Sequence, residues 1–113
     1  MKKNKQPALF IGRWQPFHQG HKAIIETVLK EGQDVVIAVR DTVKSEENPL
    51  TYPQRRDMIY SALMEHLDRV LVISIPDIGS VCYGRKVGYE VREIRLDPDT
   101  EAISGTEIRK NGV

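Results

Sequence analysis

Cysteine is almost absent from this sequence of 113 residues, since Cys82 is the only one. A single cysteine excludes an internal disulfide and a zinc site built from several cysteines, and it is typical of a reducing compartment. We therefore expect a cytoplasmic protein. The apolar stretch 80–83 around Cys82 favours a buried, inert thiol over a catalytic one.

An excess of charge of one sign is also missing. Seventeen lysines and arginines against sixteen aspartates and glutamates leave a formal net charge of +1. This balance gives no overall basic field for duplex nucleic acid or for an anionic membrane surface. We therefore expect no nucleic acid among the partners of this chain.

Long hydrophobic runs are absent as well. The basic start of the chain is followed by an apolar run at residues 8–12, which is too short for a secretory signal. No stretch approaches the length that a membrane-spanning helix needs, so we expect no membrane association.

What the sequence does contain is typical of one globular domain. Hydrophobic residues make up 40% and charged residues 29% of the chain. This length supports a single core but leaves no room for a second catalytic module, and there are no repeats or linkers. We expect one minimal domain over residues 1–113, with residues 1–6 flexible.

Three short apolar runs at residues 8–12, 35–39 and 70–75 predict β-strands buried on both faces, because apolar residues follow one another without alternation. Segments with helical spacing lie between these runs. The order strand, helix, strand, helix, strand predicts an α/β fold with a parallel sheet flanked by helices.

Local signals predict where the two helices begin and end. The first should begin near Gln19 and stop at Gly32, where glycine can adopt the left-handed conformation that closes a helix. The second should start near Pro53, because proline is favoured in a first turn, with Thr51 or Tyr52 at the cap.

The pattern weakens after residue 75. We predict a short strand at residues 81–83, a longer strand at 89–96 and a turn at 97–99. The spacing Ser104-x-x-Glu107 then predicts the start of a final helix.

The phrase Gly-Arg-Trp-Gln-Pro-Phe-His-Gln-Gly-His at residues 12–21 runs from the first predicted strand into the first helix. His18 and His21 are three positions apart, so both imidazoles can point from the first helical turn toward one space on the positive axis of the helix dipole. Two N–H donors there would stabilise a phosphate under attack, and Gly20 would let that phosphate approach the backbone.

Two other interpretations of His18 and His21 remain open. They can be cap and surface histidines without a chemical role, or they can be a pair of metal ligands. A zinc site would need further cysteine, histidine or carboxylate ligands at matching spacing, and none is evident nearby.

A second phrase, Ile-Ser-Gly-Thr-Glu-Ile-Arg at residues 103–109, also enters a predicted helix. Ser104 and Thr106 offer hydroxyls and backbone N–H groups, and Arg109 lies one turn on, where its planar guanidinium can bind phosphate. The alternative is a plain capping box. Two helix N-termini of this kind on one small sheet predict a site for a nucleoside triphosphate.

These phrases carry a resemblance to a known family. Residues 12–21 resemble the His-x-Gly-His signature, and residues 103–109 the Ile-Ser-x-Thr-x-x-Arg signature, of the nucleotidyltransferase superfamily. The first phrase is most similar to the nicotinamide-nucleotide adenylyltransferase branch. The segment 48–51, followed by Arg55 and residues 58–59, resembles the same branch.

The resemblance implies a fold and a reaction. The fold would be a Rossmann-like (HUP-type) α/β domain. The reaction would transfer a nucleoside monophosphate, AMP from ATP in this branch, to a phosphate-bearing acceptor with release of pyrophosphate. Nicotinamide mononucleotide is the first acceptor to consider, with NAD as the product. Magnesium would neutralise the triphosphate and be held mainly by the nucleotide phosphates and water, so no protein ligand is named.

The resemblance also implies roles for individual residues. His18 and His21 would stabilise the α-phosphate in the transition state. Arg109 would join them as a catalytic residue that holds the β- and γ-phosphates together with Ser104 and Thr106. The positions that would bind the nucleotide phosphates are Gly12, Arg13, Gly20, Ser104, Gly105 and Thr106.

Three further residues are candidates for contact with the acceptor or for lining the site. Trp14 can stack on a base or close the edge of the core. Arg55 can line the site or be solvated at the start of its helix. Asp77 can contact an acceptor or form a turn.

Only a dozen residues separate Ile78 from Val91, whereas archaeal-type adenylyltransferases have a longer strand and helix there that help form the pockets for base and acceptor. A pocket completed by a second subunit, and therefore a homo-oligomer, is one expectation. Two rival functions stay open: a cytidylyltransferase that uses CTP and a small phosphorylated alcohol, and a non-catalytic nucleotide sensor.

Overall fold

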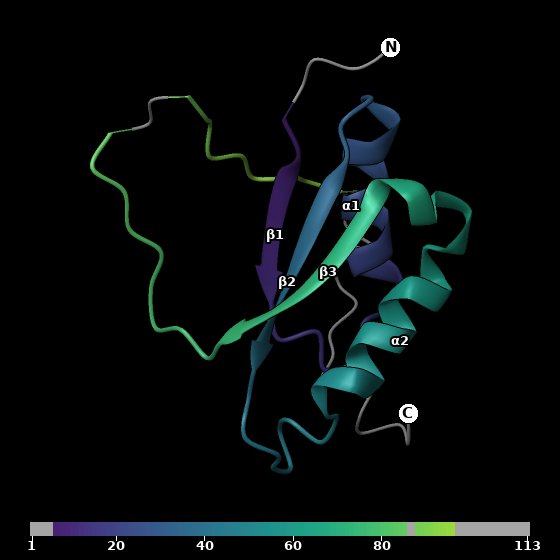
Figure 1. Ribbon diagram of the computed structural model, residues 1–113, viewed down its shortest axis with the longest axis vertical. Coiled ribbons are helices and arrows are strands. Elements are labelled where there is room, and N and C mark those ends of the chain that lie inside the picture. The colour runs from purple at the N-terminus through teal and green to yellow at the C-terminus, as the bar shows by residue number, and fades with distance from the viewer. Residues whose placement is uncertain (1–5, 86–87, 97–113) are drawn as a thin grey trace.

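The computed structural model describes residues 6–85 and 88–96. Its strands are β1 (Ala8–Gly12), β2 (Val35–Asp41) and β3 (Val70–Pro76), which form one parallel sheet in the order β1-β2-β3 (Figure 1). All three predicted strands are present, and the prediction of an α/β fold with a parallel sheet is confirmed.

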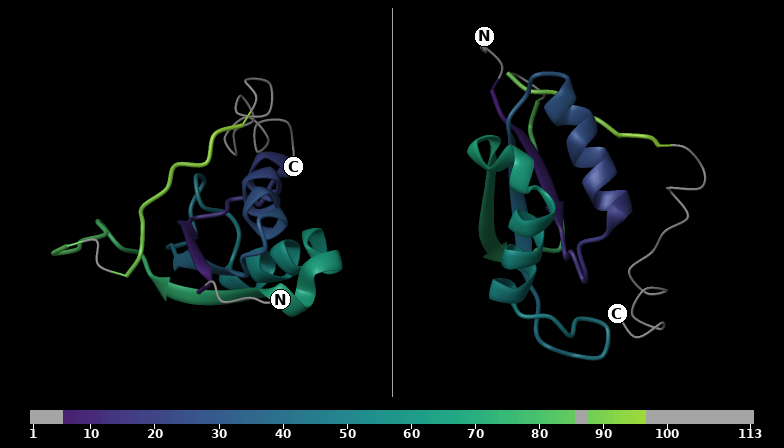
Figure 2. Two further views of the ribbon diagram at one scale, coloured as in Figure 1. Left: turned by 90° about the horizontal axis from the view of Figure 1, so that it is seen from above. Right: turned by 90° about the vertical axis from the view of Figure 1, so that its right-hand side faces the viewer.

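Helix α1 (Gln19–Lys30) connects β1 to β2, and helix α2 (Tyr52–Ala62) with the 3₁₀ helix η1 (Met64–Arg69) connects β2 to β3. Right-handed crossovers that step in one direction along a sheet place their helices on the same face. Figure 2 shows α1 and α2 together on one side of the sheet. In the described part of the chain, no helix has the length and hydropathy needed to cross a membrane.

The strand register separates a covered face from an open one. Phe10, Ile37 and Val72 are in register, and because side chains alternate along a strand they share the face that packs against the helices. This face carries most of the buried hydrophobic core, which consists of Trp14, Phe17, Ile25, Val28, Leu29, Val35, Ile37, Val39, Ile59, Leu63, Val70 and Val72.

The expectation that the strands are buried on both faces is wrong for β1 and β3. Leu9 and Leu71 lie in register with Val36 on the other face, and their exposed fractions are 59% and 54%. The physical reason is the position of the helices, since α1 and α2 both cover the opposite face (Figure 2).

The predicted helix boundaries agree with the structure. Helix α1 begins at Gln19, and Gly32 follows its end with φ +89, the left-handed conformation expected of it. Thr51, rather than Tyr52, caps α2: its Oγ1 accepts a hydrogen bond from the Gln54 N–H at 3.3 Å. The Gln54 side chain accepts in return from the Thr51 N–H at 2.8 Å.

The strands predicted at residues 81–83 and 89–96 are wrong, because residues 77–85 and 88–96 contain no strand. After β3 the chain leaves the sheet, and residues 88–96 run back to lie beside α1 (Figure 1). There Arg92 forms an ion pair with Glu31 at 3.0 Å. β-propensity produces a strand only where a neighbouring strand can pair with it.

The prediction of a buried Cys82 is also wrong. Cys82 is exposed, and its Sγ lies 3.6 Å from the Ser80 Oγ. Its apolar neighbour Val81 is 68% exposed, so the stretch does not pack onto the core. The turn at residues 97–99 and the final helix lie outside the described residues.

Candidate active site

The carboxyl ends of the three strands lie at one edge of the sheet, because the strands are parallel. Gly12, Asp41 and Pro76 end β1, β2 and β3 there. In open α/β sheets ligands bind outside this edge. The segment 13–18, which leads from β1 to α1, and the segment 42–51, which leads from β2 to α2, both start at this edge.

The two histidines form the N-terminal cap of α1. His18 is the N-cap residue, and its Nδ1 accepts a hydrogen bond from the Gly20 N–H at 3.2 Å. His21 Nδ1 accepts in turn from the His18 N–H at 3.2 Å. The two rings stack with their centroids 3.6 Å apart and an angle of 18° between their planes. The structure therefore brings together the pair that the sequence singled out.

The surroundings keep both rings neutral. Burial lowers the pKa of His18, and burial together with the neighbouring His18 lowers the pKa of His21 to about 3. A neutral imidazole carries one proton, and because both Nδ1 atoms accept hydrogen bonds, that proton is assigned to Nε2 in each ring. The pair thus offers two neutral Nε2–H donors at the positive end of the helix dipole.

Trp14 packs against the histidine pair from inside the core. Its side chain is 5% exposed, and its ring lies edge-on to His21 with centroids 4.7 Å apart. Its Nε1 donates to the Ala38 carbonyl at 3.1 Å. Of the two interpretations of Trp14, this arrangement corresponds to packing at the edge of the core.

Gly12 makes room for that indole. A Cβ at Gly12 would lie 2.9 Å from the Trp14 ring, closer than side chains tolerate. Trp14 itself has φ +53, a left-handed conformation that is uncommon for a residue with a side chain. The backbone of residues 12–14 is therefore shaped around the tryptophan.

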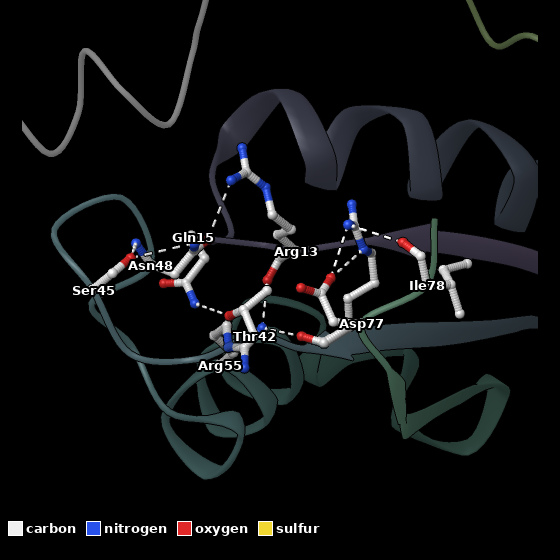
Figure 3. A network of polar contacts seen from close by, with 9 residues as sticks. Arg13, Gln15, Thr42, Ser45, Asn48, Arg55, Asp77 and Ile78 are labelled. Atoms are coloured by element: carbon white, nitrogen blue, oxygen red, sulfur yellow. Dashed lines mark hydrogen bonds and ion pairs between the residues drawn. The ribbon is translucent and has the colours of Figure 1, made fainter. Parts of the chain in front are cut away.

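Gln15 joins the segment 13–18 to the segment 42–51 (Figure 3). Its side chain is buried, its Nε2 donates to the Leu50 carbonyl at 2.9 Å and to Thr42 Oγ1 at 3.2 Å, and its Oε1 accepts from the Leu50 N–H at 2.9 Å. The sequence interpretation missed this residue. Its position inside the phrase 12–21 was the available signal.

Arg13 is exposed and its guanidinium extends from the end of β1 toward Asn48, with Nη1 donating to Asn48 Oδ1 at 3.2 Å (Figure 3). The group remains at the surface, at the edge of the sheet where β1 ends. An exposed guanidinium in this position can bind a phosphate oxygen.

Arg55 lies inside the protein rather than in solvent. It is fully buried, and its Nη1 donates to the carbonyl oxygens of Arg13 at 2.8 Å and Arg40 at 2.7 Å. Burial lowers the pKa of Arg55, while the carboxylates of Asp41 and Asp77 oppose that change. Its guanidinium stays charged, since an arginine pKa lies far above neutrality.

Asp77 is paired at the ends of β2 and β3. Arg40 Nη2 lies 2.8 Å from Asp77 Oδ1, and the same guanidinium donates to the Ile78 carbonyl at 3.2 Å. The carboxylate remains 46% exposed. The ion pair fixes the point where the chain leaves the sheet.

Four predicted site residues, Ser104, Gly105, Thr106 and Arg109, lie outside the described residues. Within the described ranges, one group of side chains has the spacing of metal ligands, namely Glu26, Glu65 and His66, whose ligand atoms lie within 4.8 Å of one another. It joins α1 to η1, and His66 Nε2 lies 3.2 Å from a Glu26 carboxylate oxygen, so these groups bind one another.

Known proteins match most of this chain. The Cytidylyltransferase-like family matches residues 9–81. The nicotinamide-nucleotide adenylyltransferase of Methanosarcina mazei is 42% identical over 131 residues, covering 91% of this chain and 75% of the relative. That of Methanococcus aeolicus is 35% identical over 130 residues with the same coverage.

A solved structure shares the fold. The bifunctional NMN adenylyltransferase/ADP ribose pyrophosphatase of Francisella tularensis, complexed with AMP and a Mn ion, gives a TM-score of 0.58 at 34% identity. The match covers 64% of this chain and 23% of that one.

The matches also show that this chain is shorter inside the shared region. An alignment of 130 or 131 residues exceeds the 113 residues of this chain, so both relatives carry residues that have no counterpart here. The family match ends at residue 81, inside the 78–91 stretch that the sequence predicts to be trimmed.

Proposed function

Because this chain belongs to the cytidylyltransferase-like family and, within it, to the nicotinamide-nucleotide adenylyltransferases, we propose that it transfers AMP from ATP to nicotinamide mononucleotide. The products are NAD and pyrophosphate. The observation that carries the proposal is the stacked His18 and His21 pair, with two Nε2–H donors at the N-terminus of α1 and beside the strand ends.

The reaction needs alignment and charge stabilisation more than it needs a reactive side chain. A phosphate oxygen of the acceptor attacks the α-phosphorus, a new P–O bond forms, and the bond between the α-phosphorus and the bridging oxygen breaks as pyrophosphate leaves. Negative charge spreads over the equatorial oxygens of the α-phosphate in the transition state. Fixed Nε2–H donors stabilise that charge without reorganising.

The remaining machinery is assigned by motif. Arg13 binds the polyphosphate from the surface. The motif places Gly12 and Gly20 beside the phosphates, although in this structure the Trp14 ring fills the space next to Gly12 and the Gly20 N–H donates to His18 Nδ1. Ser104, Gly105, Thr106 and Arg109 hold the β- and γ-phosphates at the helix start that the sequence phrase 103–109 predicts. The support for these four residues is their sequence phrase and the family membership.

A divalent ion fits this site only through the nucleotide. Among the described residues, neither His18 nor His21 belongs to a group of three possible metal ligands. The exposed Arg13 guanidinium is a donor, and the Asp77 carboxylate is paired with Arg40. This donor set suits a magnesium ion held by phosphate oxygens and water. When bound, the ion supplies charge neutralisation of the triphosphate and of the leaving pyrophosphate.

A non-catalytic nucleotide sensor is the second candidate. The observation that favours it is the shorter chain, since both relatives carry residues without a counterpart here. A sensor would bind the nucleotide through the same histidine pair and release no pyrophosphate.

The test incubates the purified chain with ATP, magnesium and nicotinamide mononucleotide, and follows pyrophosphate release and NAD formation. Parallel arms contain CTP with glycerol 3-phosphate, and each nucleotide alone. We expect NAD only in the first arm. Turnover in the CTP arm alone would replace the proposal with a cytidylyltransferase.

Thermal melts separate an inactive sensor from a protein that binds nothing. A nucleotide that binds only the native state raises the free energy of unfolding, by about 2.7 kcal/mol when its concentration is 100 times its dissociation constant. The melting temperature rises as a result. Stabilisation by ATP without turnover in any arm would support the sensor.

A further inference from the structure

Arg55 is the largest of the fully buried side chains, with an exposed fraction of 0%. An arginine is rarely buried to this extent unless a carboxylate pairs with it. Here its hydrogen-bond acceptors are three main-chain carbonyl oxygens, those of Arg13, Arg40 and Thr51. The guanidinium therefore organises backbone.

The three carbonyls belong to three different parts of the site. Nη1 binds the Arg13 carbonyl at 2.8 Å, just after β1, and the Arg40 carbonyl at 2.7 Å, near the end of β2. Nε binds the Thr51 carbonyl at 3.2 Å, at the cap of α2. One side chain thus ties two neighbouring strand ends to a helix start. Figure 3 shows its bond to Arg13.

The bond to the Arg13 carbonyl constrains the backbone of Trp14, the residue whose ring contacts His21. The Arg13 carbonyl is part of the peptide that precedes Trp14, and rotation about the Trp14 N–Cα bond determines where that carbonyl points. Trp14 holds φ at +53, which a residue with a side chain rarely adopts unless its surroundings impose it. Its ring lies edge-on to His21 at 4.7 Å.

One nitrogen of the Arg55 guanidinium is left without a hydrogen bond in the described part of the chain. Its Nη2 is buried and has no hydrogen-bond partner among the described residues. A buried donor without an acceptor is unfavourable, and so is the burial of a charge. What holds the buried guanidinium in place is its set of bonds to the main-chain carbonyls of Arg13, Arg40 and Thr51.

We propose that Arg55 is a positioning residue, which fixes the Arg13 and Arg40 carbonyls and thereby holds Trp14 and the His18–His21 pair in the geometry that receives the α-phosphate. It does not touch the nucleotide. The kinetic part of the test rests on the proposed function, whereas the spectroscopic part does not.

The first test is a comparison of Arg55→Lys with Arg56→Lys. Lysine keeps the charge, but its single nitrogen cannot reproduce the planar set of donors that reaches three carbonyls. Arg56 is the matched control, since it follows Arg55 on α2, is 40% exposed and pairs with Asp57 at the surface.

We expect Arg55→Lys to lower kcat about 10- to 100-fold while KM for ATP changes by less than about threefold, because misplaced donors weaken transition-state stabilisation. Arg56→Lys should keep the kcat of the wild type. A folded Arg55→Lys enzyme with wild-type kcat would overturn the proposal. A raised KM with unchanged kcat would also overturn it, because it would mean that Arg55 binds the substrate directly.

The second test follows the histidine ring signals by NMR between pH 5 and pH 8. In the wild type, burial lowers the His21 pKa to about 3, so its signals should not titrate in this range. Release of the Arg13 carbonyl in Arg55→Lys, or in Arg55→Met, should loosen Trp14 and admit water, which moves the His21 titration toward its ordinary value.

This readout distinguishes the two proposals. If the wild type shows no turnover, the proposed function fails, yet a His21 titration that moves in Arg55→Lys and not in Arg56→Lys still supports positioning. If Arg55→Lys lowers the melting temperature but leaves the His21 titration in place, Arg55 has a merely structural role and the proposal fails.

Discussion

At the scale of single residues, the two ring nitrogens of His18 have separate tasks. Nδ1 caps α1 by accepting from the Gly20 N–H at 3.2 Å, which leaves the Nε2–H free to act on a phosphate. An asparagine side chain can keep the capping oxygen at the Nδ1 position, because asparagine is itself a preferred cap residue. It offers nothing at the Nε2 position.

We therefore expect His18→Asn to lower the rate of pyrophosphate release about 100-fold or more, with little change in melting temperature. His18→Ala removes the cap as well and should cost about 1 kcal/mol of stability in addition. Steady-state kinetics and thermal melts of both variants make the comparison. A His18→Asn enzyme with near-normal turnover would mean that the histidine only caps the helix.

A second residue-scale prediction concerns Gly12. A methyl group there would lie 2.9 Å from the Trp14 ring, and the ring is held on its other sides by the core. We expect Gly12→Ala to lower the free energy of unfolding by about 1–3 kcal/mol, as overpacking does. Urea unfolding measures the change. Gly79→Ala is the matched control, because no atom of the described residues lies within 4 Å of a Cβ at Gly79.

At the scale of elements, Gln15 connects the segment 13–18 to the segment 42–51. Gln15→Leu would leave the N–H and the carbonyl of Leu50 without their partner. We expect the Leu50 amide to lose protection from hydrogen exchange and the protein to lose about 1–3 kcal/mol of stability. Unchanged protection at Leu50 would show that other contacts hold this segment.

Gln33→Leu is the control for that experiment. Gln33 also donates to a distant main-chain carbonyl, that of Gln6 at 2.8 Å, but this bond is exposed. An exposed bond exchanges readily with water, so its loss should have little effect on stability.

Local signals in the sequence were sufficient for the elements that carry the site. The apolar runs that became the strands, the start of α1 at Gln19 and the cap of α2 at Thr51 depend on neighbouring residues, so they could be recognised without the fold. The strand predicted at residues 89–96 failed because a strand needs an edge to pair with, and no local pattern reveals whether that edge is available.

The contacts that shape the site could not be predicted in the same way. The bond from Gln15 to Leu50 spans 35 positions and the bond from Arg55 to Arg13 spans 42. The histidine pair was recognisable because both residues lie in one helical turn. That Nδ1 accepts a backbone hydrogen bond while Nε2 carries the proton could be seen only from the hydrogen bonds that the Gly20 and His18 N–H groups donate.

At the scale of the whole molecule, the neutral histidine pair links stability to pH. The native state lowers the pKa of His18 and lowers that of His21 to about 3, while both have ordinary values near 6.5 in the unfolded chain. Below pH 6.5 the unfolded state therefore binds more protons than the native state. The contribution of the pair to the free energy of unfolding is complete above pH 6.5. It declines below that pH and is lost as the pH falls through the lowered native-state pKa of each histidine, which for His21 is about 3.

We expect the free energy of unfolding to fall between pH 6.5 and pH 5 by up to about 1.4 kcal/mol per pH unit for each histidine. Carboxylates titrate mainly below this window. Urea unfolding at pH 7.5, 6.5 and 5.5 measures the slope. His21→Asn should reduce this slope, whereas His66→Asn should leave the contribution of the His18–His21 pair to the slope unchanged. An equal slope in His21→Asn and the wild type would contradict this account.

The contact between Trp14 and His21 has a practical consequence. Trp14 is the sole tryptophan of the chain, it is almost completely enclosed, and its ring meets one ring of the pair edge-on. Any displacement of the imidazoles when a nucleotide arrives must alter the surroundings of this indole. Its intrinsic fluorescence is therefore a built-in optical reporter of occupancy, which needs no dye and has no second indole to obscure the signal.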